Sequence, residues 1–287
     1  MAEAAVIIPH YNDAARLGTC LAALMPQVAD RPVEVAVIDN GSTEDLSDLR
    51  ARHPGVLWLS EAEKGAAPAR NAGVAGTGAP CIFFLDCDCV PAPDWIETAL
   101  ALSGGDELIG GRVDVFDETP PPRSGAEAFE TVFAFPQASY IADKGFSVTA
   151  NLLTSRTVWN AVGGFRVGTA EDYDWCRRAG AAGYPIRYAD GLAVAHPTRQ
   201  DWTALRRKWV RITNEGFTSH GTTPARRVSW ALRSSAVLGS ALVHAPRVLG
   251  HAALTGGEKG RGLATLLRLR ALRTVWMLRQ AATGRTV

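Results

Sequence analysis

Short apolar runs alternate with amphipathic segments over the first hundred residues of the chain. The runs are nearly continuous in apolar residues and cover residues 5–9, 33–39, 56–60 and 81–86. Runs of this length are typical of strands that are buried on both faces of a parallel sheet. Because they alternate with helical patterns and short connections, the sequence predicts right-handed βαβ units and a doubly wound sheet.

Helix signatures occupy the segments between these runs. Residues that favour helix starts open them: Asn12 or Asp13 in the first segment, Thr43 with Glu44 in the second, and Pro68 in the third. The first segment also carries leucines at helical spacing, which predict one buried stripe: Leu17, Leu21 and Leu24.

The pattern becomes less regular after about residue 115, where prolines at 120–122 and glycines around 163–168 predict loops. A helix is predicted over 171–183 and a short strand over 186–189. Three helices are expected after them, over 202–217, 228–245 and 262–282. The predicted fold class is therefore α/β, with a mostly parallel sheet flanked by helices in residues 1–200 and an α-helical extension in residues 201–287.

Composition places the chain among globular proteins. Hydrophobic residues make up 47% of it and charged residues 21%, which excludes disorder, collagen and a coiled coil. The five cysteines form no Cys-x-x-Cys pair, so we expect reduced thiols in a cytoplasmic protein. No basic segment precedes the first apolar run, and no window of about 18 residues is apolar throughout, so neither a signal peptide nor a membrane-spanning helix is expected.

Charge is unevenly distributed, although the net charge is only +1. Residues 1–198 carry 14 basic and 26 acidic side chains, whereas residues 199–287 carry 16 basic and 3 acidic ones. This split predicts two units with different electrostatic environments and makes the helical extension basic.

Polar residues follow the predicted strands at the edge where parallel α/β sheets bind ligands. Asp39 ends the second run and is explained equally well by a turn. Asp86 ends the fourth run, and Asp88 comes two residues later. Two carboxylates this close repel each other unless a cation neutralises them, and Mg²⁺ or Mn²⁺ binds such oxygens together with substrate phosphates. The pair therefore predicts a divalent metal site.

No glycine-rich phosphate loop follows the first strand, which continues into Pro-His-Tyr-Asn, and no Gly-x-x-x-x-Gly-Lys-Ser/Thr motif occurs. Phosphates would then be neutralised by the metal and by basic side chains. Downstream, Glu171, Asp172 and Asp174 begin a predicted helix, where they either favour its dipole or supply a general base for an acceptor hydroxyl. His196 is either a structural histidine or a metal ligand.

Taken together, these segments resemble the family 2 glycosyltransferases, which have the Rossmann-like GT-A fold. The resemblance covers about residues 4–200 and rests on six motifs in order: Val-Ile-Ile-Pro-His-Tyr-Asn, Val-Ile-Asp-Asn-Gly-Ser-Thr-Glu-Asp, Gly-Ala-Ala-Pro-Ala-Arg-Asn-Ala-Gly, Phe-Leu-Asp-Cys-Asp, Gly-Gly-Phe and Glu-Asp-Tyr-Asp. Each motif is common alone, but their order and spacing are specific. The resemblance implies an inverting hexosyltransferase that uses a nucleotide-diphosphate sugar, with a UDP-sugar as the expected donor.

The resemblance also implies residues for the donor site. Pro9, Tyr11 and Asp39 would hold the nucleoside, with Asp39 against the base. Arg70 would lie near the base and the phosphates, and Glu171 would complete the nucleotide-sugar site.

Metal and catalytic roles follow in the same way. Asp86 would contact the ribose or the metal-bound diphosphate, while Asp88 and His196 would bind Mn²⁺ or Mg²⁺. Asp172 would be the catalytic base. Cys89 stands where many relatives have another acidic residue, which leaves the number of metal ligands open.

Two other functions fit parts of the sequence. One is a catalytically silent adaptor that binds a nucleotide or carbohydrate on the same fold, although intact Asp86, Asp88 and Asp172 argue against it. The other is a sugar-phosphate nucleotidyltransferase, which would need a glycine-rich basic loop after the first strand.

The expected acceptor is a hydroxyl of a glycan or a lipid-linked molecule, in cell-surface polysaccharide or glycolipid synthesis. Residues 116–147 and the surroundings of Trp175 are expected to contact it. Each Lys or Arg near an anionic leaflet contributes about 1 kcal/mol, so the basic extension predicts peripheral association with the inner membrane face rather than binding to nucleic acid. Helix 202–217, with Lys208 on its polar face, fits an interfacial helix but equally a helix packed on the catalytic domain.

Overall fold

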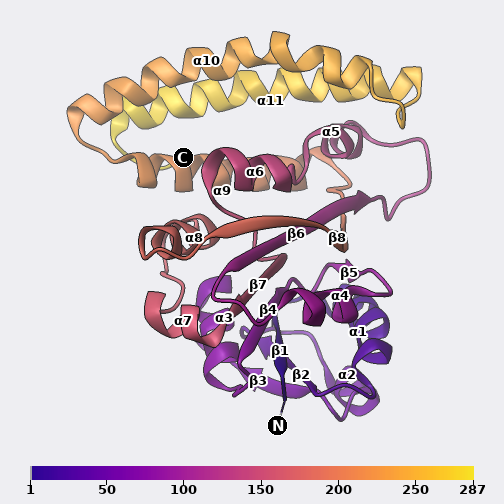
Figure 1. Cartoon of the computed structure of the whole chain (residues 1–287). Helices are drawn as coiled ribbons and strands as arrows, with labels where there is room; N and C mark the ends of the chain where they lie inside the picture. Colours follow the sequence, from indigo (N-terminus) through magenta and orange to yellow (C-terminus); the bar gives the residue numbers. More distant parts are fainter. Residues whose placement is uncertain (1) are drawn as a thin grey trace. The chain divides into compact units, whose positions relative to one another are not determined.

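The computed structural model describes residues 2–287, which include a sheet of eight strands in the order β3-β2-β1-β4-β7-β6-β8-β5 (Figure 1). The first four strands in this order are parallel. They are β3 (Leu57–Ser60), β2 (Val33–Asp39), β1 (Ala4–His10) and β4 (Cys81–Leu85). The predicted strands are therefore confirmed to within one residue at each end.

The other half of the sheet contains antiparallel pairs. β7 (Asn151–Ser155) runs antiparallel to β4 and to β6 (Leu108–Phe116). β8 (Ile186–Pro197) pairs antiparallel with the short edge strand β5 (Val90–Pro91). The α/β class is confirmed, but the sheet is mixed, and the strand predicted at 186–189 is only the start of a 12-residue strand.

Two glycines explain why β6 was hard to predict. Gly110 and Gly111 interrupt its apolar run, which weakens the strand pattern. A Cβ at Gly110 would lie 2.5 Å from Ser147 Oγ, and one at Gly111 would overlap Asn151 Nδ2. The glycines are therefore required by close packing of neighbouring segments.

Helices cover both faces of the parallel strands, as a doubly wound sheet requires. One face is covered by α1 (Ala14–Val28), α2 (Ser47–Arg52) and α4 (Trp95–Leu102). The other is covered by α3 (Ala66–Ala75), α7 (Arg156–Val162) and α8 (Glu171–Ala181). Alternate residues of β1 belong to the two clusters, Val6 and Ile8 to the first and Ala5 and Ile7 to the second.

The starts of α1 and α2 both differ from the prediction. Thr43 and Glu44 do not open a helix, because α2 begins only at Ser47. Instead, the Glu44 carboxylate accepts a hydrogen bond of 2.8 Å from the backbone N–H of Ala14, the first residue of α1. Asp13 occupies the N-cap position but makes no side-chain cap, so Glu44 satisfies one of the free N–H groups of this helix.

Contacts within the chain define two compact units. The sheet unit comprises residues up to Asp114, Phe135–Val167 and Glu171–His196, and includes α6 (Gln137–Lys144). The helical unit comprises Val115–Ala134, Gly168–Ala170 and Pro197–Val287. A division into two domains after residue 200 stays a prediction, since residues 115–134 group with the helices.

The helical unit contains α5 (Gly125–Phe133), α9 (Trp202–His220), α10 (Pro224–Leu249) and α11 (Gly256–Thr283). The three C-terminal helices are thus confirmed and are longer than predicted. Phe129 of α5, Leu205 of α9 and Leu266 of α11 share one buried cluster. No helix in residues 2–287 is long and apolar enough to cross a membrane.

Lys208, on the predicted polar face of its helix, is largely shielded from water, with 15% of its side chain exposed. Its Nζ lies 2.5 Å from Oε1 of Glu130 in α5, a carboxylate whose side chain is only 2% exposed. Arg199 donates its backbone N–H to the other oxygen of Glu130 at 2.8 Å. The polar side of α9 is therefore partly turned into the helical unit.

Candidate active site

A pocket of about 440 Å³ opens in the sheet unit at the carboxyl ends of β1 and β4. Its lining also includes the turn after β2 and the start of α3. Five residues predicted for donor and metal binding line it: Pro9, Tyr11, Arg70, Asp86 and Asp88. Residues distant in sequence meet here because parallel strands end at the same edge of the sheet.

Arg70 bridges two carboxylates beside this pocket. It is 4% exposed, and its Nη2 donates to Oδ1 of Asp86 at 2.6 Å while Nη1 donates to Oε1 of Glu171 at 3.1 Å. Burial alone would lower the pKa of Arg70, but the charges of Asp86 and Glu171 outweigh it and raise this pKa above its ordinary value. The guanidinium thus joins the end of β4 to the start of α8.

Asp88 meets His196, a residue far away in the sequence. Pairing of β5 with β8 places Val90 opposite Ala195 and brings the two side chains together. Oδ2 of Asp88 lies 3.1 Å from Nε2 of His196. The imidazole is buried and packs against the ring of Phe135 at 4.7 Å. The structure therefore brings together two of the three predicted metal ligands.

The donor chemistry of this pair fits a divalent cation. A carboxylate oxygen and an imidazole nitrogen suit Mn²⁺, and either Mn²⁺ or Mg²⁺ completes its shell with substrate phosphates. Asp86, the third predicted ligand, is paired with Arg70 instead. Within residues 2–287 no group of three or more His, Cys, Asp or Glu side chains is arranged to hold a metal, so substrate oxygens would have to supply the remaining ligands.

The cysteines around the pair are neutral thiols. Burial, reinforced by the charges of Asp88 and Asp86, raises the pKa of Cys87 and of Cys89 well above the ordinary value. Both side chains are therefore protonated thiols as long as no cation lies beside them.

The predicted base-binding residue Asp39 is held by two neighbours. The register of β1 and β2 places Asp39 opposite His10. Nδ1 of His10 lies 3.5 Å from Oδ1 of Asp39. Ser42 donates its backbone N–H to the same oxygen at 3.1 Å. Burial raises the pKa of Asp39, but hydrogen bonds from Ser42 and His10 outweigh it and lower this pKa below the ordinary value. The carboxylate is thus kept ionised.

His10 has a defined tautomer in this arrangement. The backbone N–H of Asp13 donates to Nε2 of His10 at 3.2 Å, so the ring proton lies on Nδ1. That proton faces Asp39 and the hydroxyl of Ser42, which is 3.3 Å away. Sequence reasoning noted no role for His10 or Ser42, although their places after the first two strands were a signal.

Lys64 is a further residue that sequence reasoning missed. Its Nζ lies 4.5 Å from the ring centroid of Tyr11, which is 54% exposed. Lys64 also donates to the backbone carbonyls of Asn40 and Gly41 at 3.2 and 3.0 Å. A cation and an exposed aromatic ring therefore stand together at the mouth of the pocket.

Asp172 occupies the first turn of α8, next to Glu171. Its Oδ1 accepts the backbone N–H of Tyr173 at 2.7 Å. The charge of Asp172 adds to burial in raising the pKa of Tyr140 on α6 and also contributes to the raised pKa of Arg70. The predicted base is thus within electrostatic reach of the Arg70 cluster.

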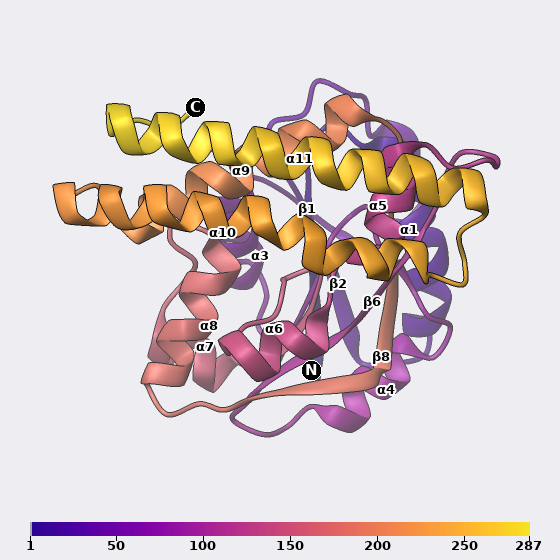
Figure 2. The ribbon, with the colours of Figure 1, turned by 90° about the horizontal axis from the view of Figure 1, so that it is seen from above.

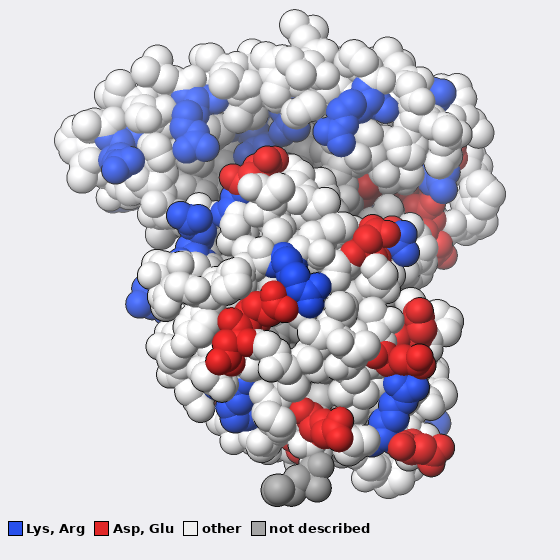
Figure 3. Space-filling model, in the orientation of Figure 1, with Lys and Arg blue, Asp and Glu red and all other residues white. Residues whose placement is uncertain are grey.

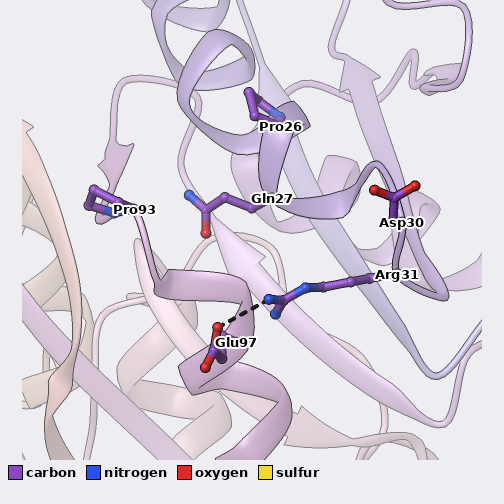
Figure 4. A pocket seen from close by; sticks show the side chains of 6 residues that line it. All are labelled: Pro26, Gln27, Asp30, Arg31, Pro93 and Glu97. Carbon is purple, nitrogen blue, oxygen red and sulfur yellow. Dashed lines mark hydrogen bonds and ion pairs between the residues drawn. The ribbon is translucent and has the colours of Figure 1, made fainter.

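A second pocket, of about 480 Å³, lies between α1 and α4 (Figure 4). Gln27 bonds there to the backbone of Ala92 and Ile96. Arg31 pairs with Glu97 at 3.1 Å. These bonds tie the two helices together and leave the polar groups of Gln27 satisfied.

Comparison with known proteins yields one family and several relatives. The sequence profile of "Glycosyl transferase family 2" matches residues 5–173. Glycosyltransferase AglE of Haloferax volcanii is 28% identical over 214 residues, which are 71% of this chain and 70% of that protein. The pre-mycofactocin glycosyltransferase of Mycobacterium tuberculosis is 28% identical over 224 residues, 71% of this chain and 45% of that protein.

Solved structures show the same fold. One match is a mannosyltransferase of Pyrobaculum calidifontis in complex with GDP-Man and Mn²⁺. The match covers 98% of this chain and 73% of that chain, with a TM-score of 0.57 and 16% identity. Another is S. aureus TarS 1-349 in complex with UDP-GlcNAc. This match covers 100% of this chain and 83% of that chain, with a TM-score of 0.53 and 16% identity. The profile covers more than half of the chain, and the order of motifs, the fold and the relatives agree with it: the chain belongs to glycosyl transferase family 2 and is a glycosyltransferase with the GT-A fold.

Proposed function

We propose that this enzyme transfers a hexose from a UDP-sugar, with inversion, to a hydroxyl of a glycan or lipid-linked acceptor in cell-surface polysaccharide or glycolipid synthesis. The observation that carries the proposal is the meeting of Arg70, Asp86, Asp88 and His196 beside one pocket. Such a site has a buried cation for a diphosphate and a pair of donors for a metal, without a glycine-rich loop.

The nucleoside would bind at the end of the pocket lined by Pro9 and Tyr11. Asp39 is not in this lining but directly precedes the lining residue Asn40. An ionised carboxylate accepts hydrogen bonds, so Asp39 would accept an N–H of the base. His10 and Ser42 would hold Asp39 in the required orientation. Uracil and guanine both offer such an N–H, which makes GDP-sugars the natural comparison with UDP-sugars.

Asp88 and His196 would hold Mn²⁺ or Mg²⁺ against the diphosphate. When bound, the cation would stabilise the negative charge of the leaving group. Arg70 would add a fixed positive charge on the other side of Asp86, at no cost of reorganisation because both of its carboxylate partners hold it in place.

Asp172 would act as the general base. It takes the proton of the acceptor hydroxyl as that oxygen attacks the anomeric carbon, and the bond from this carbon to the diphosphate oxygen breaks. The electron pair leaves with UDP, so the anomeric configuration inverts and no covalent enzyme intermediate forms. Lipid-linked acceptors would place this reaction in the cytoplasm, at the inner face of the membrane.

The test is a panel of UDP- and GDP-sugars with Mn²⁺, read by release of the nucleotide and by mass spectrometry of the product. Turnover with a UDP-sugar, and an inverted linkage by NMR, are the expected results. Faster turnover with GDP-sugars would overturn the choice of nucleotide. Tight UDP binding with no release from any donor would favour the adaptor function instead.

A further inference from the structure

Two arginines of α11 lie against one tryptophan inside the helical unit. The guanidinium carbons of Arg270 and Arg273 are 5.9 and 4.5 Å from the ring centroid of Trp209 on α9. The two arginines share one side of α11 because they are three residues apart. α10 runs beside α11 (Figure 2) and adds His244, whose Nδ1 accepts a hydrogen bond of 3.2 Å from Nη2 of Arg270. We call these four residues the Trp209 cluster.

The cluster contains hydrogen-bond donors that have no acceptor. Nε of Arg270, Nε of Arg273 and Nε1 of Trp209 are buried and have no hydrogen-bond partner within residues 2–287. All three nitrogens carry an N–H and can only donate. Arg270 is 8% exposed, so its unpaired N–H lies well inside the helical unit. Buried donors without partners cost free energy, which a ligand with several acceptor oxygens would recover.

The cluster is also positively charged. Its imidazole is neutral at pH 7, because burial and the charges of Arg270 and Arg247 lower the pKa of His244. Burial and the charges of Arg270 and Arg233 lower the pKa of Arg273 to about 10, which leaves this guanidinium protonated at pH 7. The cluster therefore holds two positive charges, and buried charges are normally paired with an opposite charge.

No acidic side chain of the helical unit balances these charges. Neither Arg270 nor Arg273 forms an ion pair in the part of the chain that the structure describes, and Figure 3 shows basic side chains along the helix pair at the top of the view. The acidic residues of the unit are engaged in helix caps, ion pairs or hydrogen bonds elsewhere: Asp117, Glu118, Glu127, Glu130, Asp201, Glu215 and Glu258.

We propose that the Trp209 cluster binds a phosphate group, as inorganic phosphate or as a phosphate monoester. A phosphate monoester carries about 1.5 to 2 negative charges at pH 7, which matches two guanidiniums, whereas a carboxylate would balance only one. Water would satisfy the unpaired N–H groups but not the charge. Guanidiniums also fit the geometry of phosphate oxygens. Arg273 is partly exposed and Arg233 beside it is exposed, so the cluster reaches the protein surface.

This proposal goes beyond glycosyl transfer and does not depend on it. The four residues of the cluster lie outside residues 5–173, which match the family profile. Phosphate binding can be measured without donor, acceptor or metal. The phosphate would come either from a soluble ion or from the headgroup of a phospholipid, and the experiment distinguishes the two sources.

The experiment is urea unfolding of the full chain in EDTA, with inorganic phosphate compared with sodium chloride at equal ionic strength. A ligand that binds only the folded state raises the urea midpoint as its concentration increases. We expect phosphate to raise the midpoint more than chloride does, and calorimetry to give its dissociation constant. Dihexanoyl phosphatidic acid, a short-chain lipid with a phosphate monoester, should compete for the same site. Tighter binding of this lipid identifies a headgroup as the source, and tighter binding of inorganic phosphate identifies a soluble ion.

Three variants test the cluster itself. R270M removes a buried charge that has no opposite charge beside it, so without phosphate it should be at least as stable as the wild type, and it should lose the response to phosphate. R273Q changes a partly exposed side chain, and W209F keeps an aromatic ring but loses an N–H. Each of these two should raise the dissociation constant of phosphate about 10- to 100-fold.

The matched control is R279Q, which changes an exposed arginine of the same helix and should respond to phosphate as the wild type does. Circular dichroism checks that each variant is folded. The proposal is overturned if the wild type responds to phosphate no more than to chloride. An equal response of the wild type, R270M and R273Q also overturns it, because a general salt effect or another site would then explain the stabilisation.

Discussion

Asp39, Asp86 and Asp88 look alike in the sequence, but each meets a different partner. Asp39 accepts a hydrogen bond from Ser42 and faces His10, Asp86 is paired with the buried Arg70, and Asp88 faces His196. A carboxylate already neutralised by a guanidinium gains less from a metal than one beside an imidazole. At the scale of single residues, the metal site is therefore expected to depend on Asp88 and His196 more than on Asp86.

Asp88→Ala should abolish turnover while the protein stays folded, because the metal would lose its carboxylate. His196→Ala should raise the Mn²⁺ concentration needed for half-maximal rate by about 10- to 100-fold. Metal titration of the reaction measures both, with the exposed Asp94→Ala as the control. Full activity in EDTA contradicts the assignment.

Asp172→Asn should slow transfer at least ~100-fold and leave UDP affinity near the wild-type value, because a general base acts only in the chemical step. Calorimetry with UDP and initial rates separate the two effects. Asp174→Asn is a matched control, since Asp174 is engaged with Arg178 at 2.8 Å and should affect rate far less. Loss of UDP binding in Asp172→Asn would make this residue a donor ligand.

At the scale of elements, a residue pattern can indicate a helix start without showing which helix the capping residue serves. Thr43 and Glu44 have the composition of a helix start, and that composition alone does not say which helix they serve. Glu44 caps α1 from a distant loop, which is a tertiary contact with no local signature.

Glu44→Ala should destabilise the protein by about 1 kcal/mol, the usual loss for a helix N-terminal cap. Urea unfolding monitored by circular dichroism measures it. Glu44→Gln keeps an acceptor oxygen and should recover most of the loss. Equal stability of Glu44→Ala and the wild type would show that water replaces the cap at no cost.

The ion pair between α5 and α9 predicts a dependence on pH. Burial lowers the pKa of Lys208 to about 8, even though Glu130 acts to raise it. Between pH 8 and the ordinary lysine pKa of about 10.5, the unfolded chain keeps a proton that the folded protein has lost. Raising the pH through this window therefore favours the folded state.

Lys208→Met should remove this gain. The measurement is the difference in urea midpoint between wild type and variant at pH 8 and at pH 10, which cancels the titration of tyrosines and cysteines common to both. A difference that stays constant with pH would mean that the amine is protonated in the folded protein throughout the window.

At the scale of the whole molecule, the parts that could be predicted are those with strong local patterns. The parallel strands are continuous apolar runs, and the aspartates at their ends follow from the topology of such sheets. β6 was missed because Gly110 and Gly111, which close packing requires, interrupt its apolar run. The pairing of Arg70 with Asp86 and Glu171 was missed because all three side chains were expected to face the metal or the substrate.

The uneven charge of the sequence persists in the folded units. The sheet unit carries 13 basic and 22 acidic side chains, and the helical unit carries 17 and 7. Residues 115–134 bring acidic groups into the basic unit, where Glu130 meets Lys208 and Asp117 meets Arg123 at 2.6 Å. Part of the predicted surface charge is thus neutralised internally.

The grouping of α5 with the C-terminal helices has a consequence for synthesis on the ribosome. α5 packs against α11, where a Cβ at Gly262 would lie only 3.3 Å from Ala128. Translation adds about 5–20 residues per second, so on the order of ten seconds pass between the emergence of α5 and that of its partner. During this interval the apolar side of α5, including Phe129, lacks its native cover.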